Sequence, residues 1–285
     1  MDVQLPKFVL EIVNKFEKAG FEIYIVGGAV RDIFMGKIVD DWDFTTNAIP
    51  EEIQKIFPDS FYDNKFGTVG ISEASSPNPY EITTFRKEFG YSDKRSPDKV
   101  EWGKNLEEDL SRRDFTINSL ALKIQNPNDK TQIEEIIDPF DGKNDLSKKL
   151  IKAVGDPNER FSEDALRMMR AVRIASELGF LIENKTLEAI KKNATLINQI
   201  AKERVKDEFF KILSSPNPYD GILIFRNVGL MEQILPELEK CFGVEQKSPG
   251  RHHIYDVGVH LLMSLKFCKL EDPVVRFATL IHDIG

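Results

Sequence analysis

The sequence lacks the features of secreted and membrane proteins. It has only two cysteines, Cys241 and Cys268, in 285 residues. Two cysteines cannot build a disulfide framework, which predicts a protein of the reducing cytoplasm. No stretch approaches the roughly 20 consecutive apolar residues of a membrane span, so we expect no membrane partner. The N-terminus has no basic region followed by an apolar block, which predicts no signal peptide.

Two common nucleotide-binding fingerprints are also missing. The chain contains neither a G-x-x-x-x-G-K-[ST] loop nor a G-x-G-x-x-G run. The formal net charge of −8 argues against a protein that coats nucleic acid nonspecifically. It does not exclude a nucleic-acid enzyme, because such an enzyme needs only a local basic groove and carries metal-binding carboxylates of its own.

Hydrophobic periodicity predicts an α/β part followed by a helical part. A first helix is predicted to end at Gly20, and residues 22–26 alternate as a strand that turns Ile23 and Ile25 to one face. Further strands are expected at 41–46, 67–73 and 80–86, with a helix that begins at Pro50. Beyond about residue 150 strand signals nearly vanish, and Ser162 stands where it could cap a long helix.

Two glycines and two carboxylates lie close together near the N-terminus. Gly27 and Gly28 follow the first predicted strand, where a turn into a helix would let the backbone approach a phosphate. Asp41 and Asp43 are two apart on a predicted strand, so their side chains share a face. Like charges that close repel unless a cation lies between them, which favours magnesium and a triphosphate. The alternatives are a tight structural turn and a solvated strand.

Glu81 is a third candidate acid. It heads the predicted strand at 80–86, where it could join Asp41 and Asp43 across a sheet. Three such acids would hold two metal ions about 4 Å apart and support in-line displacement of pyrophosphate. The alternative is an edge-strand glutamate in water.

These motifs give the chain a resemblance to a known family. The sequence resembles the class II nucleotidyltransferases, which comprise the tRNA CCA-adding enzymes and the related bacterial poly(A) polymerases. The matching motifs occur in family order over roughly residues 22 to 240: GGAVRD, DWD, YEITTFR, RRDFTINSLAL, DPFDGKNDL, RFSEDALRMMRAVRIASELGF and KERVKDEFFKIL. At Asp141 the family usually has a glycine.

The resemblance implies a fold and a domain order. We expect an α/β nucleotidyltransferase head with a small mixed sheet, a polymerase-β-like palm, followed by an all-α neck and body. The expected divisions are a head at 1–145, a base-recognising neck at 146–205, an RNA-binding body at 206–250, and the beginning of an HD domain at 251–285. Residues 85–102 match a loop that the family uses to switch from C to A addition; the alternative is an ordinary solvated loop.

The resemblance also assigns roles to the head residues. Asp41 and Asp43 are expected to bind magnesium, with Glu81 as the third acid. Gly27, Gly28 and Arg31 are expected to hold the triphosphate, although Arg31 also stands where it would pair with Asp32. The sugar and phosphates of the incoming nucleotide are expected to contact Arg113, Asp114 and Asn118.

The segment EDALR carries the predicted base recognition. Asp164 and Arg167 are three apart on a predicted helix, and the family pairs these residues with the base of CTP or ATP. A carboxylate accepts and a guanidinium donates, as reading a Watson–Crick edge requires. Arg170 is a further nucleotide-binding candidate. The alternative is a surface ion pair worth under about 0.5 kcal/mol.

All four histidines lie near the C-terminal end. This region resembles the start of an HD-type phosphohydrolase domain, whose first metal ligands would be His260, His282 and Asp283. Because a further family ligand normally lies downstream, we expect a truncated chain. The alternative is a helix pair with incidental histidines.

The predicted activity is transfer of CCA, or part of it, to the 3′ end of tRNA, with CTP and ATP as substrates and Mg²⁺ as cofactor. A poly(A) polymerase shares every catalytic motif, but those relatives resemble more basic proteins with a basic tail. An inactive tRNA-binding module is the third reading, and the intact acidic trio argues against it.

Overall fold

The chain divides into two compact units. The structure, a computed structural model, describes residues 5–62, 67–74, 76, 78–90, 99–103, 105–125, 132–245 and 254–284. The head comprises most of the chain up to Val154, and the helical unit comprises Gly155–Gly285 with the short segment Lys149–Ile151. The prediction of an α/β head followed by a helical part is confirmed. The finer division at 205 and 250 stays a prediction.

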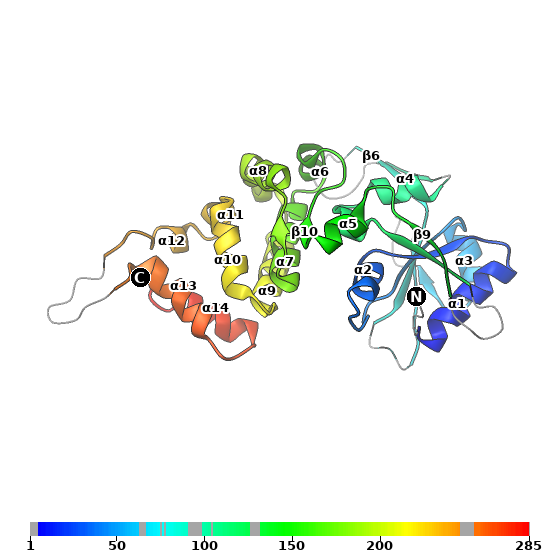
Figure 1. The fold of residues 1–285 in the computed structure, drawn as a ribbon, viewed down its shortest axis with the longest axis horizontal. Helices are drawn as coiled ribbons and strands as arrows, with labels where there is room; N and C mark the ends of the chain where they lie inside the picture. The colour runs from blue at the N-terminus through cyan, green and yellow to red at the C-terminus, as the bar shows by residue number, and fades with distance from the viewer. Residues whose placement is uncertain are drawn as a thin grey trace. The chain divides into compact units, whose positions relative to one another are not determined.

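A seven-stranded mixed sheet forms the centre of the head (Figure 1). The strand order is β3-β4-β5-β2-β1-β8-β9. Its only parallel pair among the described residues joins β2 to β5. The strands are β1 (Ile23–Val26), β2 (Asp43–Thr46), β3 (Phe61–Tyr62), β4 (Thr68–Ile71), β5 (Tyr80–Thr84), β8 (Ala121–Gln125) and β9 (Gln132–Ile137).

The two faces of this sheet pack differently. As predicted, Ile23 and Ile25 share one face, and both are buried with α1 (Lys7–Lys18) and α3 (Pro50–Ile56) in the main core. Alternation along β1 turns Val26 to the other face, where it packs with α4 (Leu106–Ser111). The second core is small, which leaves part of this face for polar side chains.

Shorter elements surround the sheet. They are α2 (Gly28–Phe34), η1 (Thr116–Asn118), α5 (Gly142–Ser147) and an antiparallel pair of β6 (Arg86–Phe89) with β7 (Lys99–Trp102). The predicted loop 85–102 therefore contains two strands at its ends, and its residues 91–98 lie outside the described residues. Trp102 lies against Gly67, which has a φ of +87°.

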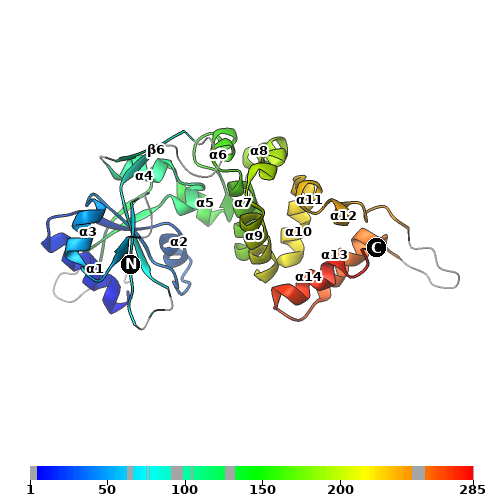
Figure 2. The ribbon, with the colours of Figure 1, turned by 180° about the vertical axis from the view of Figure 1, so that it is seen from behind.

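In the helical unit, the helices that pack side by side are α7, α9, α10, α13 and α14 (Figures 1 and 2). A two-residue parallel pair, β10 with β11, accompanies them and was not predicted. The elements are β10 (Leu150–Ile151), α6 (Pro157–Glu163), α7 (Leu166–Leu178), β11 (Leu181–Ile182), α8 (Asn184–Asn193), η3 (Ala194–Gln199), α9 (Lys202–Ser214), α10 (Pro218–Asn227), α11 (Leu230–Ile234), α12 (Pro236–Glu239), α13 (Val257–Phe267) and α14 (Pro273–Ile281).

The long helix expected to begin at Ser162 is two helices. Ser162 lies inside α6, so its predicted capping position is wrong. The cap of α6 is Asp156, which accepts a hydrogen bond from the Asn158 amide at 2.8 Å. Within the described ranges, no helix is both long and apolar enough to cross a bilayer, and both cysteines are free.

The start of α5 accounts for the glycine that the resemblance leads us to expect at position 141. Asp141 has a φ of +60°, in the left-handed region that favours glycine. The Asp138 carboxylate accepts hydrogen bonds from the next two amides, Gly142 N at 2.7 Å and Lys143 N at 3.0 Å. A Cβ atom added at Gly142 would lie 2.2 Å from the Thr116 carbonyl oxygen. The close packing of α5 on η1 therefore requires glycine at 142.

We expect Gly142→Ala to lower the free energy of unfolding by about 1–3 kcal/mol, because the added methyl group must push backbone apart. Ser147→Ala, on the exposed end of the same helix, is the control and should change stability by less than about 0.5 kcal/mol. Urea unfolding followed by circular dichroism measures both. Equal stability of the two variants would contradict the close packing.

Candidate active site

Two acids meet on the head sheet. In the parallel pairing of β2 with β5, Asp43 is the register partner of Glu81. Partners in register turn their side chains to the same face, so these two carboxylates are neighbours. Asp43 is half-buried and Glu81 is exposed. Their face is the one that carries Val26, the register partner of Asp43 on the other side.

Asp41 does not lie on the strand as expected. β2 begins at Asp43, and Asp41 is exposed in the segment before it. Trp42, between the two acids, is buried in the main core and its carbonyl accepts a hydrogen bond from the Glu81 amide at 3.2 Å. The chain therefore keeps Asp41 next to the acid pair but outside the regular ladder. Among the described residues, Asp41, Asp43 and Glu81 do not form a three-ligand group with all ligand atoms within 4.8 Å.

The glycine turn joins this acid pair to an arginine. Gly27 has a φ of +72° and precedes α2. A Cβ atom added there would lie 3.0 Å from Arg113 Nη1 and 3.2 Å from Asp43 Oδ2. The backbone of the turn thus lies directly against a guanidinium and a carboxylate, an arrangement that only glycine permits.

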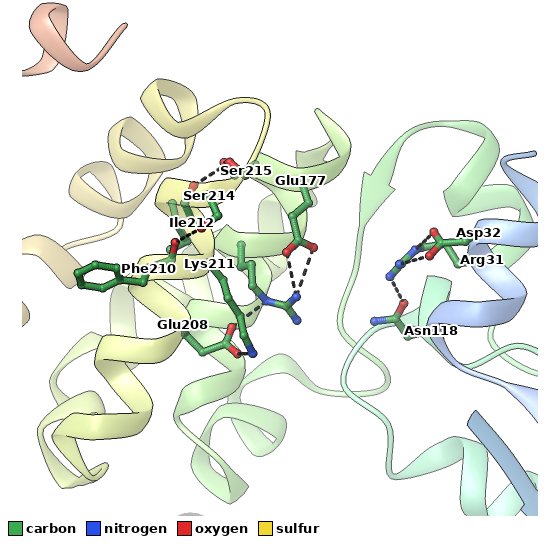
Figure 3. A network of polar contacts seen from close by, with 12 residues as sticks. Arg31, Asp32, Asn118, Glu177, Glu208, Phe210, Lys211, Ile212, Ser214 and Ser215 are labelled. Carbon is green, nitrogen blue, oxygen red and sulfur yellow. Dashed lines mark hydrogen bonds and ion pairs between the residues drawn. The ribbon is translucent and has the colours of Figure 1, made fainter. Parts of the chain in front are cut away.

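Arg31 belongs to a second polar cluster beside the turn (Figure 3). Its guanidinium donates to both carboxylate oxygens of Asp32, at 2.9 and 3.0 Å, and to Asn118 Oδ1 at 2.9 Å. Asn118 Nδ2 in turn donates to Asp114 Oδ1 at 3.4 Å. The pairing of Arg31 with Asp32, left open by the sequence, is present, and Asp114 and Asn118 lie together. Their nucleotide contacts stay predictions.

Asp109 is a buried acid that the sequence did not single out. It is fully buried, and its carboxylate accepts from Arg112 Nη2 at 2.7 Å and Arg112 Nε at 3.0 Å. Arg113 Nη2 lies 3.5 Å from the other oxygen. Burial raises the pKa of Asp109, but Arg112 and Arg113 outweigh burial and hold the pKa below its ordinary value. The signal in the sequence was the i, i+3 and i, i+4 spacing of an acid and two arginines.

Asp164 occupies the joint between α6 and α7 rather than the face of a helix. Its Oδ1 accepts from the Leu166 amide at 3.0 Å, and its Oδ2 lies 3.4 Å from Arg204 Nη2 on α9. The expectation that Asp164 and Arg167 share one helical face is wrong, because α6 ends just before Asp164, whose backbone is extended, and α7 begins only at Leu166. Arg167 Nη1 pairs with Glu163 at 2.6 Å and donates to the Arg160 carbonyl at 3.3 Å.

A second set of ion pairs joins α7 to α9. Arg173 pairs with Glu177 at 3.0 Å within α7 and with Glu208 on α9 at 2.8 Å, and Figure 3 shows both acids in this network. Arg170 lies between Arg167 and Arg173 along α7 and is half-buried. Two residues of α9 therefore make ion pairs with this region: Arg204 with Asp164, just before α7, and Glu208 with Arg173, within α7.

A histidine cluster lies between α13 and the end of α14. His260 Nε2 is 3.3 Å from His282 Nε2, and Asp283 Oδ2 is 3.6 and 3.7 Å from these two nitrogens. The other ring nitrogen of His282 lies 2.8 Å from the Thr279 carbonyl oxygen. All three ligand atoms are within 4.8 Å of one another. His252 and His253 lie outside the described residues.

The helical unit also contains a cavity of about 700 Å³. Its wall includes the half-buried rings of Phe210 and Phe277, whose centroids are 5.6 Å apart, and the exposed Lys206. Asn198 and Gln233, joined by a 2.9 Å hydrogen bond, also line it.

Comparisons with known proteins match both units. Residues 23–152 match a family model described as the poly A polymerase head domain, and residues 179–242 match one described as a probable RNA and SrmB-binding site of polymerase A. A protein of Limosilactobacillus reuteri named CCA-adding enzyme is 50% identical over 231 residues, which are 81% of this chain and 55% of the relative. A CCA-adding enzyme of Pediococcus pentosaceus is 46% identical over 239 residues, which are 83% of this chain and 56% of that relative. The chain thus spans a little over half the length of these relatives.

A solved structure gives the same result. The crystal structure of the Bacillus stearothermophilus CCA-adding enzyme in complex with CTP is 39% identical, with a TM-score of 0.69, over 80% of this chain and 53% of that chain. A tRNA nucleotidyltransferase complexed with a primer tRNA and an ATP analogue, at 24% identity and a TM-score of 0.71, shares the fold. Over about four fifths of its length the chain is therefore similar to CCA-adding enzymes, and its residues 23–152 match the poly A polymerase head domain.

Proposed function

We propose that this chain adds CCA, or part of it, to the 3′ end of tRNA. The 3′-hydroxyl of the RNA attacks the α-phosphate of CTP or ATP, an ester bond forms, and pyrophosphate leaves. The observation that carries the proposal is the meeting of Asp43 and Arg113 at the Gly27 turn. An acid for a metal, a cation for phosphate and an open backbone turn are the three groups that nucleotidyl transfer needs in one place.

The acids fit magnesium in chemistry and placement. Mg²⁺ prefers oxygen ligands and commonly binds through one or two carboxylates plus substrate phosphates. Asp43 and its register partner Glu81 supply such oxygens, and the exposed Asp41 is two residues away on the chain. When bound, the metal would activate the attacking hydroxyl and stabilise the leaving pyrophosphate.

The turn and its arginine suit the triphosphate. Gly27 lets phosphate oxygens approach the backbone, and the planar guanidinium of Arg113 presents donors to them. Arg31 reaches the same region but is held by Asp32 and Asn118, so its part is to order the turn and orient Asn118 and Asp114 toward the sugar.

Base recognition is assigned to the start of α7. Asp164 accepts and Arg167 donates, and Arg170 follows one turn later. The Leu166 amide and Arg204 fix the orientation of the Asp164 carboxylate, as a side chain that substitutes for a template requires. tRNA is proposed to contact the body, where Lys206 and the rings of Phe210 and Phe277 offer a cation and stacking surfaces. We also propose that the enzyme acts in the cytoplasm.

Two other functions remain to be separated by experiment. A poly(A) polymerase shares the head, and an inactive tRNA-binding module would keep the helical unit. The named CCA-adding relatives, at up to 50% identity, favour CCA addition over the first, and the Asp43–Glu81 pair favours an enzyme over the second.

The direct test offers CTP, ATP or both, with Mg²⁺, to a tRNA transcript ending at the discriminator nucleotide and to an unstructured RNA primer. We expect extension of the tRNA by CCA and then a stop, resolved on a sequencing gel. Asp41→Ala should abolish incorporation while tRNA binding stays within about twofold, because Asp41 acts on the metal and not on the RNA.

Asp40→Ala is the matched control, since Asp40 is an adjacent exposed carboxylate with no assigned role. Near-normal turnover of Asp41→Ala would refute the metal assignment. Long adenosine tails would identify a poly(A) polymerase, and binding without extension would point to a binding module or to a fragment of a longer enzyme.

A glycine pair tests the turn. Gly27→Ala and Gly36→Ala both strain a left-handed backbone, at φ of +72° and +65°, but a Cβ atom at Gly36 meets nothing within 4 Å. Each should lose about 1 kcal/mol of stability. Only Gly27→Ala should also weaken CTP binding, by at least about tenfold, because its methyl group displaces Arg113 and Asp43. Isothermal titration calorimetry measures this, and equal CTP affinity in both variants would exclude a phosphate role for the turn.

The histidine cluster is proposed as a transition-metal site of an HD-type domain. Imidazole nitrogens and a carboxylate suit such a metal, and the Thr279 carbonyl can orient His282 with its Nε2 toward the ion. We expect Co²⁺ titration to show one bound equivalent by visible absorption, and His282→Ala to lower Co²⁺ affinity by at least about tenfold. His253→Ala is the control. Unchanged Co²⁺ binding in His282→Ala would leave a helix pair with incidental histidines.

A further inference from the structure

Asp109 is a buried charge that the proposed chemistry does not use. It lies on α4 with no exposed surface, and arginines surround it. A buried carboxylate is costly unless cations and hydrogen bonds compensate it, so its presence calls for a reason. Arg112 alone, with two hydrogen bonds at 2.7 and 3.0 Å, would satisfy one of its oxygens.

The second oxygen faces Arg113. Arg113 Nη2 lies 3.5 Å from Asp109 Oδ2, while Nη1 of the same guanidinium points to the Gly27 turn. Arg113 Nε is buried and makes no hydrogen bond within the described part of the chain. One terminal nitrogen of Arg113, Nη1, thus lies at the turn, and the other, Nη2, pairs with Asp109.

α4 is itself firmly placed. Asn105 caps its first turn by accepting from the Glu108 amide at 2.9 Å, and the buried Leu106 and Leu110 pack it against the sheet. Glu108 pairs with Lys87 of β6 at 3.1 Å. Asp109 therefore sits at a fixed point, and the i, i+4 spacing brings Arg113 to it.

We propose that Asp109 is a positioning residue that holds the Arg113 guanidinium over the Gly27 turn, in place to meet the triphosphate. The inference rests on the proposed nucleotidyl transfer. An arginine side chain has several rotatable bonds, and a fixed carboxylate behind it removes most of that freedom before the nucleotide binds. The remaining donors of Arg113 then face the turn.

The test measures equilibrium binding of CTP by calorimetry in Asp109→Asn, which keeps the shape of the side chain and removes its charge. We expect CTP affinity to fall about tenfold in Asp109→Asn and also in Arg113→Met, and we expect the double variant to bind no more weakly than Arg113→Met alone. In the primer assay the change should appear in KM more than in kcat. Asp145→Asn, another buried aspartate of the head, bonded to the Thr116 hydroxyl at 2.8 Å, is the control.

Two outcomes overturn the inference: unchanged CTP affinity in Asp109→Asn, or an equal loss in the wild-type and Arg113→Met backgrounds. If Asp109→Asn does not fold, Arg112→Gln decides, because it removes the two hydrogen bonds of Arg112 and leaves Arg113 as the ion-pair partner of Asp109. CTP affinity at or above the wild-type value supports the inference, and a loss equal to that of Arg113→Met refutes it. A wild-type chain that binds no CTP would instead refute the proposed function itself.

Discussion

The parallel register of β2 with β5 is the constraint on which the candidate active site depends. It sets Asp43 opposite Glu81, and the antiparallel register of β1 with β2 sets Val26, the residue before the glycine turn, on the other side of Asp43. A slip of one residue would turn the acids into the apolar core, because side chains alternate between faces. The large core under the opposite face, with Ile25, Phe44 and Ile82 buried, makes such a slip very costly. The position of the charges is therefore fixed by apolar packing on the far side of the sheet.

Glycine, acid and arginine then form one electrostatic unit. The Asp43 carboxylate and the Arg113 guanidinium both lie where a Cβ atom of residue 27 would point, and Arg113 also pairs with Asp109. A second hydrogen-bonded cluster lies on α2 and η1 and the residues before η1; it comprises Arg31, Asp32, Asn118 and Asp114. In both sets each cation contacts an acid of the fold, so the site is charged yet ordered before any ligand arrives, which lowers the entropy lost on binding.

The sequence predicted those features of the fold that depend on residues close together along the chain. The alternation of Ile23 and Ile25, the start of α3 at Pro50 and the mixed α/β head all follow from periodicity and capping. Three features were missed: Asp41 lies outside β2, Asp164 interrupts a periodic helix, and Asp109 is buried. At Asp164 the apolar period continues across the break, so nothing in the pattern reports that its carboxylate binds the Leu166 amide instead of lying on a helical face. Burial of Asp109 follows from the packing of α4 on the sheet, which one segment cannot reveal.

The break at Asp164 has a consequence for how a side chain can act as a template. A carboxylate has about four acceptor positions; here one oxygen accepts from the Leu166 amide and the other faces Arg204. Both oxygens are held, yet each has a lone pair left, so the proposed contact with an amino group of a base would break neither interaction. Arg167 is fixed likewise through Nη1, bonded to Glu163 and to the Arg160 carbonyl, while a guanidinium carries five donor hydrogens. In the proposed function, these two contacts give the Asp164 carboxylate the single orientation that discrimination between bases requires.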